Sequence, residues 1–61
     1  MEERIDYGTE LRVWRVRARL SQEELADKLG IYRGTLSEVE NGKMPLSKQV
    51  FEEWMKRLER S

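Results

Sequence analysis

The sequence predicts an all-α fold, a compact domain of four helices in which the last helix is long. Apolar residues recur at helical spacing along the chain, helix-capping residues precede the apolar runs, and no segment alternates like a strand. With 61 residues, of which 38% are hydrophobic and 39% charged, the chain is long enough for one small core under a solvated surface. We therefore expect a single domain over residues 1–61.

The first helix is expected to begin after Asp6, because a carboxylate at that position can cap the free backbone N–H groups of the first turn. Four apolar residues then recur at i, i+4, i+7 and i+11 and share one face of a helix. These residues are Tyr7, Leu11, Trp14 and Ala18. They predict the side of the first helix that faces the core.

The second helix has the clearest boundaries in the chain. Ser21 and Glu24 form the S-x-x-E pattern of a capping box, and Leu20 and Leu25 stand at the positions of a hydrophobic staple. Gly30 follows the last apolar residue and can adopt the left-handed conformation that ends a helix. These signals predict a short helix between Ser21 and Gly30.

Two further helices follow in the second half of the chain. The third is expected from about Arg33 to Asn41, with Gly42 ending it. The fourth is expected from Ser47, its N-cap, to about Arg60. Their inward residues, by helical spacing, are Leu36 and Val39 in the third helix and Val50, Phe51, Trp54, Met55 and Leu58 in the fourth.

Three stretches together resemble the lambda-repressor-like (XRE-type) helix-turn-helix family. They are L-S-Q-E-E-L-A-x-K-L-G at 20–30, T-L-S-x-V-E-N-G-K at 35–43, and Y-G-x-x-L-R-x-W-R at 7–15. The resemblance covers roughly residues 7–43, with the helix-turn-helix core at about 21–42. It implies the fold of that family, here with one long C-terminal helix in place of the usual helices 4 and 5.

The resemblance also implies how the domain contacts a DNA backbone. In the family, the Gln at the position of Gln22 binds a phosphate at the start of helix 2, where free N–H groups favour an anion. The loop after helix 3 lies along the phosphates, partly through its backbone N–H groups. The expected phosphate contacts are Gln22, Arg15, Asn41, Lys43 and Arg12. Arg15 is further expected to form a largely buried ion pair with Glu40.

Helix 3 is the expected reading surface for base edges. Arg33 can bond a guanine bidentately, the Thr35 methyl can pack on a thymine methyl, and Glu38 can accept only from a cytosine amine. Two positions depart from the family pattern. Tyr32 stands where Ser or Thr usually caps the helix, and Gly34 removes a reading side chain. Either a close backbone approach at Gly34 or stacking of Tyr32 on a sugar is compatible with these changes.

Net charge is zero but unevenly distributed. Residues 1–20 hold five basic and four acidic residues, residues 21–42 hold two and five, and residues 43–61 hold five and three. A generic polyanion binder would be basic overall, so any DNA contact has to use one positive face. The cations that the family geometry would gather on one rim are Arg12, Arg15, Arg19, Arg33, Lys43 and Lys48.

The amino-acid composition argues against several other classes of function. The chain has no Cys and no His, so it lacks disulfides, the commonest zinc ligands and the usual neutral-pH base. We expect no enzyme, no metal and no cofactor. No apolar run approaches a membrane span, and MEERIDYG lacks the apolar stretch of a signal peptide. We expect a cytoplasmic protein without a membrane partner.

A homodimer is the expected assembly. Residues toward the end of the last helix have less of the core to pack on. A self-complementary contact between two copies is therefore expected to involve Met55, Leu58 and Trp54. Val13 and Val16, which lie off the inward stripe of the first helix, either join that contact or lie singly at the surface. A two-fold dimer would place its recognition helices about 34 Å apart, for a palindromic site.

The sequence therefore favours a DNA-binding transcriptional regulator whose partner is double-stranded DNA. The resemblance points to a repressor from a phage, a mobile element or a toxin–antitoxin-like operon. The alternative is a protein-binding module, such as an anti-repressor or an assembly factor, that keeps the fold and uses an acidic face. Zero net charge, Tyr32, Gly34 and Glu38 are the features that favour the alternative.

Overall fold

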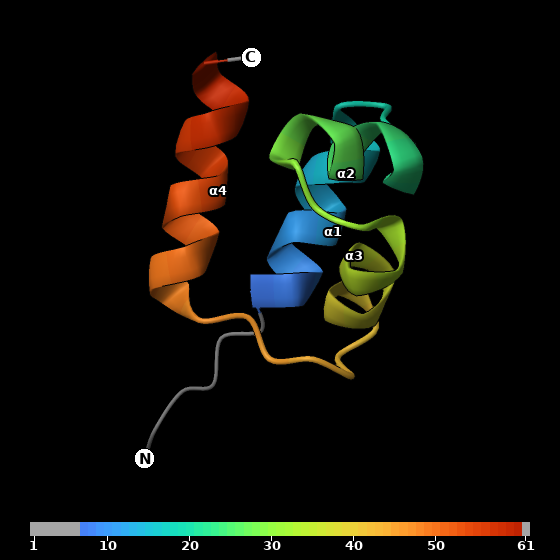
Figure 1. The fold of residues 1–61 in the computed structure, drawn as a ribbon, viewed down its shortest axis with the longest axis vertical. Helices are drawn as coiled ribbons and strands as arrows, with labels where there is room; N and C mark the ends of the chain where they lie inside the picture. Colours follow the sequence, from blue (N-terminus) through green and yellow to red (C-terminus); the bar gives the residue numbers. More distant parts are fainter. Residues whose placement is uncertain (1–6, 61) are drawn as a thin grey trace.

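The computed structural model describes residues 7–60, and this part of the chain folds into four helices (Figure 1). They are α1 (Tyr7–Arg17), α2 (Gln22–Leu29), α3 (Arg33–Glu40) and α4 (Lys48–Arg60). The prediction of an all-α fold with a long last helix is confirmed, because α4 has 13 residues and residues 7–60 contain no strand. The predicted cap Asp6 lies outside the described residues. No helix in this range is both long and apolar enough to cross a bilayer.

α1 ends in a turn that the sequence does not predict. Arg19 has a φ of 60°, in the left-handed region where Gly is the usual residue. The Arg19 N–H donates to the Val16 carbonyl at 3.0 Å, and the Leu20 N–H donates to the Arg15 carbonyl at 3.1 Å. This pair of bonds is a Schellman motif, which satisfies two of the free carbonyls at the helix end. The motif directs the chain sharply from α1 into α2.

α2 begins and ends as its sequence predicts. The Ser21 hydroxyl accepts from the Glu24 N–H at 3.1 Å, and the Ser21 N–H donates to the Glu24 carboxylate at 2.8 Å. The capping box is therefore complete. At the other end Gly30 has a φ of 71°, the left-handed conformation expected of it. The Ile31 N–H then donates back to the Ala26 carbonyl at 3.0 Å.

α3 follows after a three-residue connection and is capped less completely. Tyr32 stands at the N-cap position and makes no side-chain cap bond, as its phenol predicts. The helix ends at Glu40, one residue before the predicted end, and Gly42 with a φ of 77° closes it. α4 begins after Ser47, whose hydroxyl accepts from the Val50 N–H at 3.2 Å.

The core lies where the four helices meet. Its buried apolar residues are Leu11, Leu25, Ala26, Leu29, Leu36, Val39, Trp54 and Leu58. Two of the predicted inward residues are exposed. Ala18 is exposed because α1 ends one residue earlier, and Val50 is 38% exposed because it lies at the edge of α4.

α4 packs along α1 and α2, and Figure 1 shows it standing on the opposite side of α1 from α3. Two contacts fix it in place. The rings of Tyr7 and Phe51 lie 5.1 Å apart between centroids and join the start of α1 to the start of α4. Arg57 donates to the Leu29 carbonyl at 2.8 Å, at the negative end of the α2 dipole. α4 therefore closes the core and leaves the outer side of α3 uncovered.

Candidate nucleic-acid interface

A buried ion pair joins α1 to the end of α3. Arg15 Nε donates to Glu40 Oε2 at 2.8 Å, and Arg15 Nη2 donates to Glu40 Oε1 at 3.0 Å. The side chains are 14% and 1% exposed, respectively. Two parallel charge-assisted bonds of this kind hold both the distance and the orientation of the partners. The structure thus places these two groups as the resemblance implies.

Gln22 and Leu20 complete the cluster around this pair. Gln22 Nε2 donates to Glu40 Oε1 at 3.1 Å, and Arg15 Nη1 donates to the Leu20 carbonyl at 2.8 Å. The carboxylate of Glu40 therefore accepts three hydrogen bonds, from α1 and from the first turn of α2. Because the cluster links α1, the turn after it, α2 and α3, it fixes the angle between α2 and α3.

The same bonds limit what Arg15 and Gln22 can offer to a phosphate. A guanidinium has five N–H groups, and Arg15 uses three of them internally. The Gln22 amide has two N–H groups and uses one. Gln22 therefore keeps one donor at the start of α2, where the helix dipole favours an anion. Arg15 acts mainly on the position of the helices.

The first turn of α2 carries two exposed carboxylates, of Glu23 and Glu24. Hydrogen bonds from the backbone N–H and then from the side chain of Ser21 lower the pKa of Glu24, with a smaller contribution from the charge of Lys28. Glu24 is therefore held ionised next to the end of the helix that would receive a phosphate. This charge competes with an incoming anion and restricts the contact to the Gln22 side of the turn.

The outer face of α3 is open to solvent. Helical periodicity places Gly34 and Glu38 in the middle of this face, opposite the buried Leu36 and Val39. Arg33 and Glu38 are exposed, whereas Gly34 is partly buried. A carboxylate thus stands near the centre of the expected reading surface, and Arg33 lies five positions earlier, at the start of the helix.

Tyr32 and Thr35 lie at two edges of this face. Tyr32 is 80% exposed, and its ring covers Gly34, where an added Cβ would lie 3.0 Å from Tyr32 Cε2. A side chain at position 34 would therefore have to displace the ring. Thr35 is half-buried and turns toward α4. Of the five predicted reading residues, Arg33, Glu38 and Tyr32 are the ones whose side chains are fully open to a groove.

The loop after α3 differs from the expectation that its backbone binds phosphates. The N–H groups of Asn41, Gly42 and Lys43 donate to the carbonyls of Ser37, Val39 and Glu38, respectively. The Met44 N–H also donates to Glu38. These donors are used to end the helix, so the expected backbone contact is wrong. Phosphate binding by this loop depends on the side chains of Asn41 and Lys43.

Asn41 has a further contact that sequence reasoning missed. Its amide donates to the Ser37 hydroxyl at 3.4 Å, a long bond that ties the loop side chain to the outer side of α3. The spacing of four residues on a helix was the available signal, because i and i+4 side chains lie next to each other. Sequence reasoning also missed the Schellman turn at Arg19 and the bond from Arg57 to α2, neither of which has a local sequence signal.

The remaining predicted cations are exposed. Arg12, Arg19, Arg33, Lys43 and Lys48 all have open side chains. Arg12 lies with Val13 and Val16 in a groove of about 440 Å³ on the outer side of α1, and it makes no hydrogen bond to the Arg15–Glu40 cluster. Arg15 is the exception, because Glu40 balances its charge in the interior.

The expected dimer contact of α4 needs correction. Trp54 and Leu58 are each 9% exposed and belong to the core of the single chain, and Met55 packs against that core. They are buried because α4 packs against α1 and α2. Trp54 and Leu58 therefore offer little surface to a second copy. Val13 and Val16 are more open apolar residues on α1, at 43% and 59% exposure.

Comparison with known proteins agrees with this geometry. A family model described as a helix-turn-helix domain matches residues 6–61, which is nearly the whole chain. No curated protein and no solved structure matched the chain. The matched range includes the capping box of α2, the turn at Gly30 and all of α3. The chain therefore belongs to the helix-turn-helix domain family, a class of DNA-binding regulators.

Proposed function

We propose that this protein is a sequence-specific transcriptional repressor that inserts α3 into the major groove of double-stranded DNA. The observation that carries the proposal is the cluster of Arg15, Gln22 and Glu40, which fixes α2 against α3 while the outer face of α3 stays uncovered. In helix-turn-helix docking the second helix enters the groove and the first crosses the backbone. α3 and α2 take these two roles here.

Each exposed group has a part in this proposal. Gln22 contacts a phosphate at the start of α2, with Asn41 and Lys43 doing so on the far side of α3. Arg33 reads a guanine, and Glu38 selects for a cytosine amine while disfavouring other bases. Tyr32 lies against the sugar-phosphate backbone beside Gly34. Zero net charge is compatible with these contacts, because the acids of α2 and the cations of the rim lie on different elements.

Two copies on a palindromic site fit this arrangement, with half-sites about 34 Å apart. We place the protein in the cytoplasm, the compartment of the DNA in the phage, mobile-element and toxin–antitoxin-like operons to which the sequence resemblance points. Because α4 buries Trp54 and Leu58, the second copy has to be bound through other residues or through the DNA itself. Sedimentation with and without a palindromic duplex distinguishes these two routes.

The test is fluorescence anisotropy of the whole chain with labelled random duplex at two salt concentrations. For a DNA-binding domain, the logarithm of the binding constant falls linearly with the logarithm of the salt concentration, and the slope is set by the number of phosphates contacted. Arg33→Ala should then relax base preference in a selected site, whereas Lys43→Ala should weaken all duplexes alike and flatten the salt slope by about one. Equal effects of both variants on every duplex would contradict the assigned roles.

A second candidate function rests on Glu38. A carboxylate near the centre of the open face repels phosphates, and Glu23, Glu24 and Asp27 add exposed negative charge on α2. These features favour a protein-binding module that presents the same face to a basic partner. Absence of salt-dependent binding to any duplex, together with tighter DNA binding by Glu38→Gln, would favour this alternative.

A further inference from the structure

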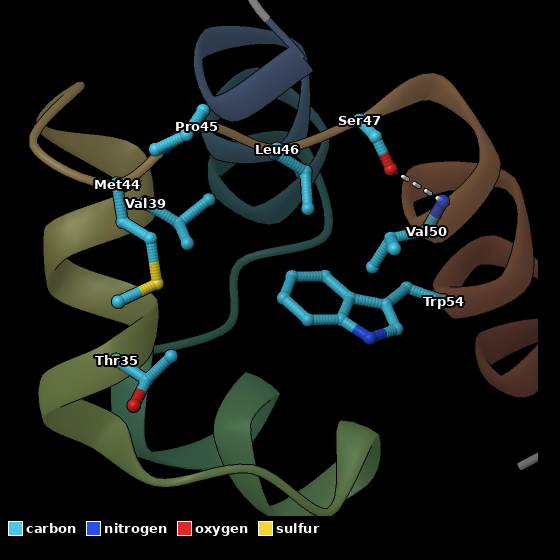
Figure 2. A pocket seen from close by; sticks show the side chains of 8 residues that line it. All are labelled: Thr35, Val39, Met44, Pro45, Leu46, Ser47, Val50 and Trp54. Atoms are coloured by element: carbon cyan, nitrogen blue, oxygen red, sulfur yellow. Dashed lines mark hydrogen bonds between the residues drawn. The ribbon is translucent and has the colours of Figure 1, made fainter.

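A hollow of about 360 Å³ lies between α3, the loop after it and α4 (Figure 2). It exists because α3 and α4 each pack on α1 and α2 but hardly on each other. Thr35 and Val39 line it from α3, Met44 and Leu46 from the loop, and Val50 and Trp54 from α4. Figure 2 shows the Trp54 ring reaching from α4 toward α3, opposite Met44 and Thr35.

The lining has no charged side chain, although 39% of the chain is charged. Its polar groups are few and lie among apolar ones. They are the hydroxyls of Thr35 and Ser47 and the indole N–H of Trp54. Ser47 accepts a bond from the Val50 N–H, and the Trp54 indole donates to no group of residues 7–60. Apolar walls with a small number of polar groups are typical of small-molecule sites.

Size and charge together define the class of ligand. The volume falls within the roughly 300–1,000 Å³ of small-molecule pockets, well above the space needed by a single side chain. An anion or cation placed here would lose part of its water without gaining a partner charge, which disfavours phosphates, nucleotides and carboxylates. Trp54 is only 9% exposed, so it offers the hollow a limited part of its ring, and this part favours an aromatic molecule through dispersion and edge-to-face contact.

We propose that this hollow is a binding site for one uncharged, largely aromatic small molecule, which contacts α3 and α4 at the same time. The bound molecule fills the space that the direct packing of the two helices leaves open. It adds the contacts that α3 otherwise lacks on its α4 side. The proposal concerns the free protein, so it stands or falls independently of DNA binding.

A matched pair of fluorescent probes tests the proposal on the whole chain. N-phenylnaphthylamine is neutral, and anilinonaphthalene sulfonate has the same rings with an added negative charge. We expect saturable binding of one neutral probe per chain, with a rise in its emission. The sulfonate should bind at least about tenfold more weakly, because the lining cannot balance its charge. Absence of saturable binding, or equal affinity for the two probes, would overturn the proposal.

Two matched variants locate the site. Val50, 38% exposed, lies at the edge of the hollow, and Val13, 43% exposed, lies in the groove on α1. Val50→Glu puts a carboxylate at the opening and also completes a capping box with Ser47, so the fold is expected to be retained. Val50→Glu should weaken binding of the neutral probe at least about tenfold, and Val13→Glu should leave that affinity unchanged. The opposite pattern would assign the probe to α1.

The two tryptophans give a direct readout. In a nitrogen–proton correlation spectrum, the indole signal of Trp54 should move on addition of the neutral probe. The indole signal of Trp14, which does not line the hollow, should stay in place. Assignment uses Trp14→Phe. Movement of Trp14 alone would overturn the proposal, as would a dimer that forms at high protein concentration and excludes the probe, because a second copy would then be the occupant.

Discussion

The guanidinium of Arg15 and the carboxylate of Glu40 meet through two hydrogen bonds, of 2.8 and 3.0 Å, across 25 positions of sequence. Glu40 is 1% exposed at its side chain, so its charge is stable in the interior only while Arg15 is present. The pair contributes less to net stability than to the choice of one arrangement of α1 and α3. Any change to one partner should therefore act on both stability and the reading face.

Removing one member of this pair is the most severe single change that we expect. Glu40→Leu strands the Arg15 charge and should lower the free energy of unfolding by on the order of 3 kcal/mol. Arg15→Met/Glu40→Leu, which removes both charges, should be less destabilised than the sum of the two single variants. Urea unfolding of the unchanged protein, Arg15→Met, Glu40→Leu and the double variant gives the coupling energy between the two side chains. Simple additivity would show that the two side chains do not act as a pair.

The sequence was sufficient for those features whose signals are local. The capping box at Ser21, the stop at Gly30 and the N-cap at Ser47 each depend on residues within a few positions, and all three are present. The ion pair of Arg15 and Glu40 was expected from a family resemblance, because nothing local in the sequence relates two charges so far apart.

Other features could not be predicted, for physical reasons that differ from case to case. Val50 has the helical spacing of a core residue, but the gap between α3 and α4 leaves it at the edge of a hollow. Trp54 and Leu58 were predicted to face inward and also offered as dimer contacts, because the length of α4 that the core could cover was unknown. The backbone donors of the loop at 41–43 depend on how α3 ends, and a Schellman turn consumes them.

Arg19 gives a second prediction, because a non-Gly residue stands at a left-handed position. Its φ of 60° brings its Cβ into an unfavourable contact with its own backbone. Arg19→Gly removes this strain and should stabilise the protein by about 0.5–1 kcal/mol, which is a rise of several degrees in Tm. Arg19→Ala is the matched control, since it removes the same side chain but keeps the strain. A gain of equal size in the control would attribute the effect to lost charge.

Gly34 gives a third prediction, with opposite effects on stability and on DNA binding. Its backbone is helical, so Gly34→Ala should stabilise α3 by up to about 1 kcal/mol. The added methyl group would lie 3.0 Å from the Tyr32 ring, which has to shift slightly to admit it. Thermal unfolding measures the gain, and anisotropy with a duplex measures the loss of contacts at the reading face. The control is the double variant Tyr32→Ala/Gly34→Ala compared with Tyr32→Ala alone, because no ring is then displaced.

A loss of stability without any change in DNA affinity would contradict this reading of Gly34. It would mean that the Tyr32 ring cannot move and that the face around it does not approach the DNA. The opposite result, higher stability with weaker binding, is what a close backbone approach at this position requires.

Glu24 gives a prediction about pH. Hydrogen bonds from Ser21 lower its pKa in the folded state below the ordinary value of 4.5. The pKa of Glu24 is lower in the folded state than in the unfolded state. The ionised carboxylate therefore stabilises the fold at pH values above the unfolded pKa, and this contribution is lost as pH falls through the folded pKa. Glu24→Gln should therefore lose stability at neutral pH and show a smaller fall in Tm on acidification. Glu23→Gln is the control, because Glu23 lies in the same turn and its carboxylate makes no hydrogen bond to any group of residues 7–60. Identical acid profiles for the two variants would show that the capping box does not produce the shift.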